Sequence, residues 1–473
     1  MTIRKEIHVA VLLSAAVLAL ASCGGGTTIG SSTPPLSSSG TSGTPAASAT
    51  ASSAPGGSNT PAPRGSNTPA PGASSTSGST PTAPASSASI PFPSATDSDP
   101  FYAQPKPFPN VPNGTILASR SVTYEPDSVA QPNAAWELKF ASRDVNGNPI
   151  AATAAVAKPL VAPSGAANVL VENFAEDALS PECAPSHDVT GGNTDTDETG
   201  VPDLGSSLSW TLIYPDFEGP SSEYAAGRLE GQIVLDSIKA AEQFAPLGLN
   251  AQTKVGINGY SGGAIAASWA SSLEASYAPG LNIVGVTSGG TPADISGIVN
   301  NIDTDMVSNS LFFDLIFTAA VGINRAYPEF LTPSLNAAGV TAATMSASGC
   351  GGKYTGASSG PTGTFATYTN GNILTAPGFI AGNALDMLAQ PNETPVTNEF
   401  VYHSVTDELI PIAGADAMVK AWCAAGAKIG YYRALSGDHV TTELVNEQFV
   451  IAFLTAKFNG IAPVYPPTTT TCN

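Results

Sequence analysis

Gly259-Tyr260-Ser261-Gly262-Gly263 stands between two segments of different character. Val255-Gly256-Ile257, just before it, has the apolar composition of a buried strand, and an Ala-rich helix pattern begins just after it at Ala264. A strand, a sharp turn carrying Gly-x-Ser-x-Gly and a helix are typical of a nucleophile elbow. The glycines at 259 and 263 leave room where the backbone of such a turn is tight. Ser261 is therefore the candidate nucleophile.

The same pattern occurs a second time, in Gly356-Ala357-Ser358-Ser359-Gly360. This match lies in a stretch rich in Gly, Ser and Thr, and no apolar strand precedes it. Because the strand before the turn is part of the motif, the flanking sequence favours Ser261 over Ser358.

Strand and helix patterns alternate along residues 99–473, which we expect to form one large domain. Residues 136–140 and 150–156 predict an antiparallel hairpin around a turn at 146–149. Further strands are predicted at 168–174, 210–216, 283–286, 400–403 and 429–433, and a helix at 227–244. This alternation predicts an α/β fold, with a mostly parallel central sheet and helices on both faces. From about residue 295 to 395 the alternation lapses, which predicts an inserted helical cap.

A serine nucleophile needs a base, and the base needs a carboxylate to orient it. Of the four histidines, His8 and His187 precede Ser261, whereas in α/β-hydrolases the base follows the serine. His403 lies within an apolar strand pattern, where we expect a core residue with its hydrogen bonds satisfied. His439 follows the last predicted strand in a glycine-containing loop, so it is the candidate base.

The orienting acid is expected in the loop after the preceding strand. Asp407 comes first after that strand and is preferred, with Glu408 as the alternative. Asp438 adjoins the base, in a loop before a helix pattern that starts at Thr441, and we expect it to shape that loop. An oxyanion also needs two backbone N–H donors. We expect them from Gly262, and from Asp177 in the loop after the strand at 168–174.

The N-terminus has the features of an export signal. Residues 1–22 combine a basic start, a short apolar run and small residues before Cys23, which predicts a cleaved signal peptide. Leu20-Ala21-Ser22-Cys23 resembles a bacterial lipobox, which implies a lipid anchor on Cys23 and a membrane-anchored location at the cell envelope. An ordinary cleaved signal is the alternative. Residues 23–98 consist largely of Ser, Thr, Pro, Ala and Gly, which predicts a disordered tether.

Charge and the positions of cysteine and histidine bear on partners, cofactors and disulfides. The net charge of −20 and the lack of a basic patch argue against nucleic acid as a partner. No cysteines or histidines occur at metal-ligand spacing, so we expect no metal cofactor. Apart from Cys23, four cysteines remain, which allows three disulfide connectivities in an exported chain. The preferred pairing is Cys183 with Cys350 and Cys423 with Cys472.

The folded part resembles the secretory lipase family, typified by yeast lipase A. The resemblance rests on several blocks: Glu176-Asp177, Cys183-Ala184-Pro185-Ser186, Tyr214-Pro215-Asp216-Phe217-Glu218-Gly219-Pro220, Gly227-Arg228-Leu229-Glu230-Gly231, the elbow, Gly289-Gly290-Thr291-Pro292-Ala293-Asp294, Asp407 and His439. It implies an α/β-hydrolase fold with a helical cap over an acyl-chain tunnel, and hydrolysis of triacylglycerols and simpler carboxylic esters without a metal.

Carried over by position, the resemblance implies Ser261, Asp407 and His439 as the triad, and Asp177 and Gly262 as oxyanion donors. Acyl transfer to an alcohol would use the same residues, so it remains an alternative. A second alternative, a non-catalytic surface lipoprotein on the same scaffold, would be expected to lack a triad member. The sequence leaves the preferred acyl length and the oligomeric state open.

Overall fold

A ten-stranded sheet runs through the part of the chain that the computed structural model describes. The described residues are 90–126, 130–191, 200–347, 350, 360–390 and 393–472, without the side chains of 306–308, 310 and 311. The predicted signal peptide, Cys23, nearly all of the predicted tether and Ser358 lie outside them. Among the described residues, no helix is long and apolar enough to cross a membrane.

The strands follow the order β1-β2-β3-β5-β4-β6-β7-β8-β9-β10 across the sheet. The six from β5 to β9 in this order pair in parallel, whereas β1, β2, β3 and β10 join at the two ends in antiparallel fashion. Their bounds are β1 Ile116–Tyr124, β2 Gln131–Arg143, β3 Pro149–Ala157, β4 Asn168–Asn173, β5 Trp210–Pro215, β6 Lys254–Tyr260, β7 Ile283–Gly289, β8 Glu399–Ser404, β9 Ile429–Ala434 and β10 Thr470–Cys472.

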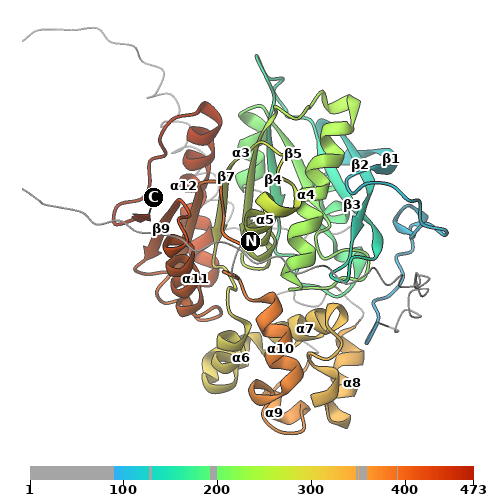
Figure 1. The fold of residues 1–473 in the computed structure, drawn as a ribbon, viewed down its shortest axis with the longest axis vertical. Helices are drawn as coiled ribbons and strands as arrows, with labels where there is room; N and C mark the ends of the chain where they lie inside the picture. The colour runs from blue at the N-terminus through green and yellow to red at the C-terminus, as the bar shows by residue number, and fades with distance from the viewer. Residues whose placement is uncertain are drawn as a thin grey trace, which may run out of the picture. The chain divides into compact units, whose positions relative to one another are not determined.

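Helices connect the parallel strands, as the alternation predicts (Figure 1). Their bounds are α2 Pro185–Val189, α3 Gly200–Ser207, α4 Gly227–Gln243, α5 Gly262–Tyr277, α6 Ile295–Thr304, α7 Met306–Ala326, α8 Ala337–Ser346, α9 Phe365–Tyr368, α10 Pro377–Asp386, α11 Ile412–Ala424 and α12 His439–Asn459. Short 3₁₀ turns add η1 Pro100–Tyr102, η3 Pro181–Cys183, η4 Ala245–Leu247, η5 Thr332–Ser334 and η6 Ile373–Thr375.

Side chains of the central strands point alternately to the two faces of the sheet, and each face has its own hydrophobic core. Val169 and Val171 of β4 belong to the apolar cluster that includes α4 and α5. Leu170, between them, belongs to a second cluster that includes Phe453 of α12. Side chains of successive strand residues point to opposite faces, so this apolar run requires helices on both sides of the sheet.

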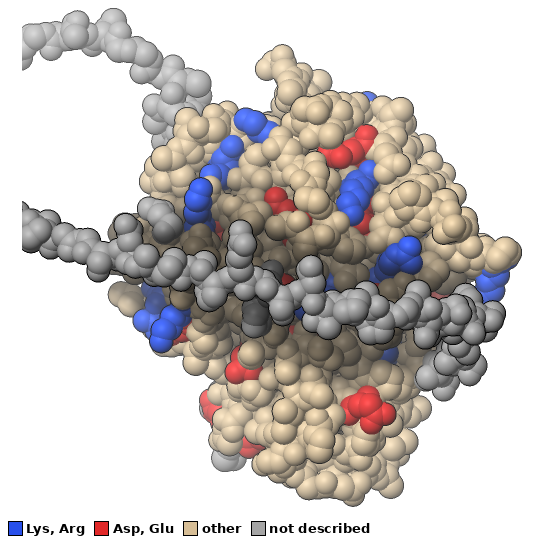
Figure 2. Space-filling model, in the orientation of Figure 1, with Lys and Arg blue, Asp and Glu red and all other residues tan. Residues whose placement is uncertain are grey.

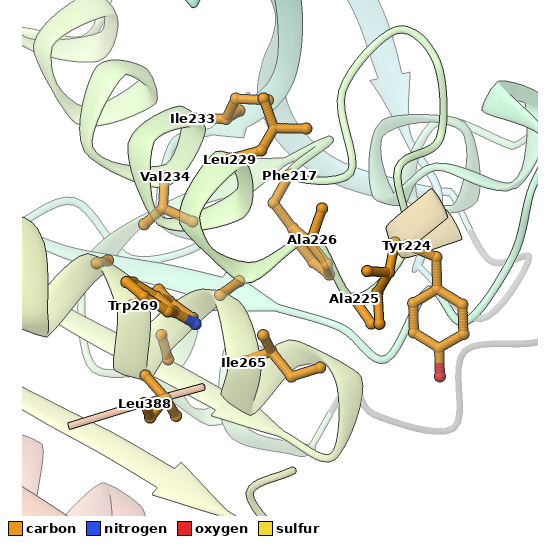
Figure 3. Close-up of a cluster of buried hydrophobic side chains, with 14 of the residues drawn as sticks. Phe217, Tyr224, Ala225, Ala226, Leu229, Ile233, Val234, Ile265, Trp269 and Leu388 are labelled. Carbon is orange, nitrogen blue, oxygen red and sulfur yellow. The ribbon is translucent and has the colours of Figure 1, made fainter. Parts of the chain in front are cut away.

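Helices α4 and α5 pack unusually closely, because α4 has glycines where α5 has Trp269. A Cβ on Gly227 would lie 2.3 Å from Trp269 Nε1, and one on Gly231 would lie 2.6 Å from the Trp269 carbonyl carbon. Figure 3 shows Trp269 and Ile265 of α5 among side chains of α4 such as Val234. This contact fixes the helix that begins at the elbow.

Helices α6 to α10 all fall between β7 and β8, over the stretch where the sequence predicts a cap. They lie together at the lower end of Figure 1. Within the described residues of this stretch, the β-structure is an isolated bridge between Leu335 and Thr369. Asp294 begins the group, since its side chain accepts from the Ser296 N–H at 3.0 Å and caps α6.

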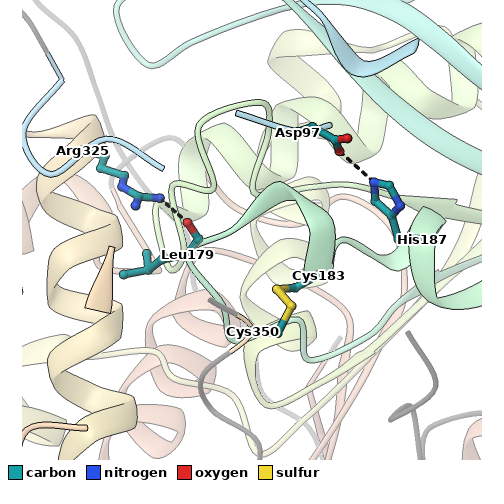
Figure 4. The surroundings of a disulfide bond; sticks show 6 residues. All are labelled: Asp97, Leu179, Cys183, His187, Arg325 and Cys350. Carbon is teal, nitrogen blue, oxygen red and sulfur yellow. Dashed lines mark hydrogen bonds and ion pairs between the residues drawn. A yellow bond between two sulfur atoms is a disulfide. The ribbon is translucent and has the colours of Figure 1, made fainter. Parts of the chain in front are cut away.

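Both preferred cysteine pairs form disulfides in the structure. Cys183 bonds to Cys350 and Cys423 bonds to Cys472, with Cα–Cα distances of 5.4 and 5.6 Å. The first pair lies near the contact between Arg325 and Leu179 (Figure 4). On the face drawn in Figure 2, Lys and Arg side chains are scattered among neutral residues.

Candidate active site

Ser261 occupies a strained turn between β6 and α5. Its φ of 50° and ψ of −120° are unusual for a residue with a side chain. The turn is held by the neighbouring strand, because the Ser261 N–H donates to the Gly289 carbonyl at 2.9 Å. Ser261 is buried at 7% relative exposure. The expected strand, turn and helix are all present around it.

The three glycines of the elbow meet backbone or side-chain atoms that exclude a Cβ. At Gly263 a Cβ would lie 1.8 Å from the Asn173 carbonyl oxygen, and at Gly259 it would lie 2.2 Å from the Gly263 oxygen. At Gly262 it would lie 2.3 Å from Asp177 Oδ1. The glycines therefore let the elbow approach the end of β4 and the loop that follows it.

His439 is the first residue of α12, rather than part of a loop before a helix that starts at Thr441. The reason is Asp438, whose side chain accepts from the Thr441 N–H at 2.7 Å and starts the helix two residues earlier. Asp438 thus shapes this part of the chain as expected. The Tyr260 hydroxyl donates to the His439 carbonyl at 2.6 Å, which ties α12 to β6.

The structure brings Ser261, His439 and Asp407 into one hydrogen-bonded series. His439 Nδ1 lies 2.7 Å from Asp407 Oδ2, and His439 Nε2 lies 2.8 Å from Ser261 Oγ. A carboxylate accepts, so Nδ1 carries the ring proton and Nε2 is left to accept from the serine hydroxyl. This arrangement can withdraw the serine proton during nucleophilic attack.

Asp407 rather than Glu408 contacts the imidazole ring. Glu408 Oε2 instead accepts from the His439 backbone N–H at 3.0 Å. The other oxygen of Asp407, Oδ1, accepts from the N–H groups of Leu409 and Ile410 at 3.0 and 2.7 Å. Burial alone would raise the pKa of Asp407, but His439 and His403 outweigh it and hold that pKa well below its usual range.

His403 also contacts Asp407, which the sequence did not indicate. It is fully buried in β8, and its Nε2 lies 2.9 Å from the Ile410 carbonyl and 3.3 Å from Asp407 Oδ2. Since a carbonyl only accepts, Nε2 carries a proton and points it toward both oxygens. The expected burial in a strand is confirmed, but the expected full set of hydrogen bonds is not, because His403 Nδ1 is buried without a partner among the described residues. Its proximity to the acid, four residues away along the chain, was missed.

Asp177 and Gly262, the two predicted oxyanion donors, lie side by side, since a Cβ on Gly262 would lie 2.3 Å from Asp177 Oδ1. Asp177 follows β4, is buried, and has a φ of 49° that turns the chain sharply. Two residues further on, the Leu179 carbonyl accepts from Arg325 of α7 at 3.0 Å (Figure 4). Arg325 also donates to Ser221 and Ser222 carbonyls at 2.6 and 2.7 Å, so it anchors this loop to its neighbours.

Several buried carboxyl groups lie near Asp177; they belong to the sequence blocks quoted above, but the sequence suggested no role for them. Burial raises the pKa of Glu176, Glu218 and Glu230 well above the usual range, and the acids around them raise it further. Within the described residues, no group of three or more His, Cys, Asp or Glu side chains is arranged to hold a metal ion.

An apolar pocket has Ser261 and Gly262 in its wall. Most of its lining comes from helices far from the elbow in sequence. Helix α6 contributes Ile295, Ile298 and Val299, and α7 contributes Leu315, Ile316, Ala319, Ala320 and Ile323. The pocket therefore joins the serine to the helices inserted between β7 and β8.

The chain is similar to known lipases. The family model for secretory lipases matches residues 187–465. A protein from Malassezia furfur named secreted triacylglycerol lipase LIP1 is 32% identical, over 77% of this chain and 76% of that protein. Lipase 2 from Candida albicans is 31% identical, over 77% of this chain and 82% of that protein.

Solved structures agree with this comparison. The closed state of Candida antarctica lipase A has a TM-score of 0.70 and 26% identity, and covers 79% of this chain and 88% of that one. The esterase LipA from Xanthomonas oryzae, at 16% identity and a TM-score of 0.56, shares the fold over 72% of this chain and 97% of that one. The expected α/β-hydrolase fold is confirmed, and the chain belongs to the secretory lipase family.

Proposed function

We propose that this chain is a carboxylic ester hydrolase that acts on triacylglycerols and other lipid-like esters through an acyl-enzyme on Ser261. The observation that carries the proposal is the Asp407–His439–Ser261 series, with separations of 2.7 and 2.8 Å, beside an apolar pocket. Membership of the secretory lipase family supports it, as does the similarity to a protein named as a triacylglycerol lipase.

In the proposed reaction, Ser261 Oγ attacks the ester carbonyl carbon while its proton passes to His439 Nε2. Asp407 stabilises the imidazolium that forms, and the backbone N–H groups of Gly262 and Asp177 donate to the oxyanion. His439 then gives the proton to the departing alcohol. Water, deprotonated by His439, attacks the acyl-enzyme and releases the acid.

The apolar pocket between Ser261 and helices α6 and α7 suits an acyl chain. Burying hydrocarbon stabilises binding by about 0.8 kcal/mol for each methylene removed from water. Ile298 and Val299 from α6 and Ile316 from α7 provide such a surface. The helices between β7 and β8 thus act as a cap that sets which acyl chains bind.

Replacement of Ser261 tests the proposal, with Ser272 as the matched control. Ser272 is also buried and lies on α5, the helix that Ser261 precedes, but it is outside the pocket lining. We expect S261A to lower kcat for p-nitrophenyl esters by at least ~10⁴-fold, and S272A to retain turnover, with both variants folded by circular dichroism. Ester turnover by folded S261A would contradict the assignment. Product analysis with added alcohol distinguishes hydrolysis from acyl transfer.

We also propose that the protein is exported, and that Cys23 carries a lipid anchor. The basic start, apolar run and Leu20-Ala21-Ser22-Cys23 sequence support this. Relatives named as secreted lipases support export alone. Detergent-phase partitioning in a bacterial host tests the anchor: the natural chain should enter the detergent phase and C23S should not. Equal partitioning of the two would contradict it.

A further inference from the structure

A carboxyl group lies in the wall of the apolar pocket. Asp386 is the last residue of α10, and its side chain lines the same pocket as Ser261. It is 5% exposed. Among the described lining residues, Ser261 and Tyr224 are the other polar side chains, and the rest are apolar or glycine. Binding of a hydrocarbon chain does not require a carboxyl group in the pocket wall.

The two oxygens of Asp386 have different surroundings. Oδ1 accepts from the Arg228 N–H at the start of α4, at 3.3 Å, and the neighbouring Gly227 N–H also faces the carboxyl group. Oδ2 has no hydrogen-bond partner among the described residues. Leaving a buried oxygen unpaired costs free energy. A ligand in the pocket that forms a hydrogen bond to Oδ2 would therefore bind more tightly.

A purely structural role would not need the second oxygen. Arg228 binds Glu393 through two hydrogen bonds of 2.8 and 3.0 Å, which already join α4 to the segment after α10. The Ser296 N–H donates to Asn383 Oδ1 at 3.2 Å, which joins α6 to α10. These contacts and Oδ1 hold α10 in place without Oδ2, which is buried and unpaired in the pocket wall.

We propose that Asp386 forms a polar subsite in the acyl pocket. It favours esters whose acyl chain carries a hydroxyl group on the carbon that lies beside Asp386 when the ester carbonyl is at Ser261. The inference rests on the proposed ester hydrolysis at Ser261. A hydroxyl both donates and accepts, so it can pair with Oδ2 as a carboxylate or as a carboxylic acid. Burial raises the pKa of Asp386 to about 7, which makes both forms accessible near neutral pH.

Competition between two esters in one reaction tests the subsite. A series of p-nitrophenyl or methyl dodecanoates, each with one hydroxyl at a different carbon, is mixed in turn with the unsubstituted ester. The ratio of their consumption gives the ratio of kcat/KM and does not depend on the amount of folded enzyme. The variants are D386N, which keeps an acceptor for Arg228 and a second polar atom, and D386L and D386A, which do not.

We expect the natural enzyme to prefer the ester hydroxylated at one position, or at adjacent positions, by roughly five-fold or more. D386N should keep most of this preference, and D386L and D386A should lose it while still consuming the unsubstituted ester. If no hydroxyl position is preferred, or if D386A keeps the preference, the subsite is wrong. Failure of the natural enzyme to consume any ester would instead contradict the proposed function.

Discussion

At the scale of single residues, Asp407 has contacts with two imidazoles rather than one. His439 lies 2.7 Å from its Oδ2, and His403 approaches the same oxygen to 3.3 Å from the buried strand β8. The N–H groups of Leu409 and Ile410 occupy its other oxygen. We interpret His403 as a positioning residue that fixes the carboxylate against the base.

Replacement of His403 should affect turnover more than binding. In H403F the buried volume is filled but the donor is lost, and we expect kcat to fall about ten-fold, as for one hydrogen bond to a charged group, with KM nearly unchanged. In H403Q the amide N–H can replace Nε2, so kcat should recover. Steady-state kinetics on a short-chain ester measure both. Equal losses in H403F and H403Q would argue for a packing role alone.

H403F and H403Q should also differ in their stability at low pH. The pKa of Asp407 is lowered in the fold, so its contribution to stability is present above its unfolded pKa, about 3.9, and is lost as the pH falls through the folded value. Loss of the His403 donor raises the folded pKa. H403F should therefore inactivate at a higher pH than H403Q when the proteins are incubated in acid and assayed at neutral pH; the same inactivation midpoint for both would contradict this.

At the scale of elements, the two disulfides hold different structures. Cys423–Cys472 joins the short edge strand β10, which pairs with β9, to helix α11. Cys183–Cys350 follows the loop of Asp177, near the point where Arg325 binds the Leu179 carbonyl (Figure 4). The first is therefore separated from the elbow strand by several strands, and the second adjoins the proposed oxyanion loop.

Removing either disulfide should lower stability, but only one of the two removals should also lower activity. The double variant C423S/C472S opens a loop spanning 49 residues and should lose roughly 4 kcal/mol of stability, with kcat per folded molecule unchanged. C183S/C350S should lose comparable stability and also lower kcat, because the loop of Asp177 loses a support. Thermal unfolding and active-site titration measure the two effects. An unchanged kcat in C183S/C350S would show that this loop is held by Arg325 and its neighbours alone.

The central elements could be predicted because each one carries its own signal. Apolar runs marked the strands around Ser261, and chain order with loop position selected His439 and Asp407. Edge strands β1 and β10 were missed, since β1 mixes polar residues with apolar ones and β10 has three residues. The contact of His403 with Asp407, and the pocket lining from α6 and α7, depend on how the chain packs, which local patterns do not record.

At the scale of the whole molecule, the buried carboxyl groups set the response to pH. Burial raises the pKa of Glu399 and Asp386 to about 7 and that of Glu223 to about 8. In the unfolded chain these groups lose their protons near pH 4. Between the two values the folded state holds more protons, so stability falls as the pH rises. The net charge of −20 adds repulsion in the same direction.

We therefore expect the melting temperature to be highest near pH 5 and to fall toward pH 8, a range in which Asp407 alone would give no change. E399Q provides the internal control. Glu399 is buried between Ser271 and Ser288, whose hydroxyls donate to it at 3.0 Å, and a neutral amide removes up to about 3 kcal/mol of the pH-dependent loss. Calorimetry from pH 5 to 8 measures the slope. A flat profile, or the same slope in E399Q, would contradict this account.

The most direct measurement of the central claim is the site of covalent modification by a fluorophosphonate. Peptide mass spectrometry of the labelled, folded protein should place the adduct on Ser261, in step with the loss of ester hydrolysis. H439A should label far more slowly, because the serine then lacks its base. An adduct on another residue, or undiminished hydrolysis after Ser261 is fully modified, would contradict the account.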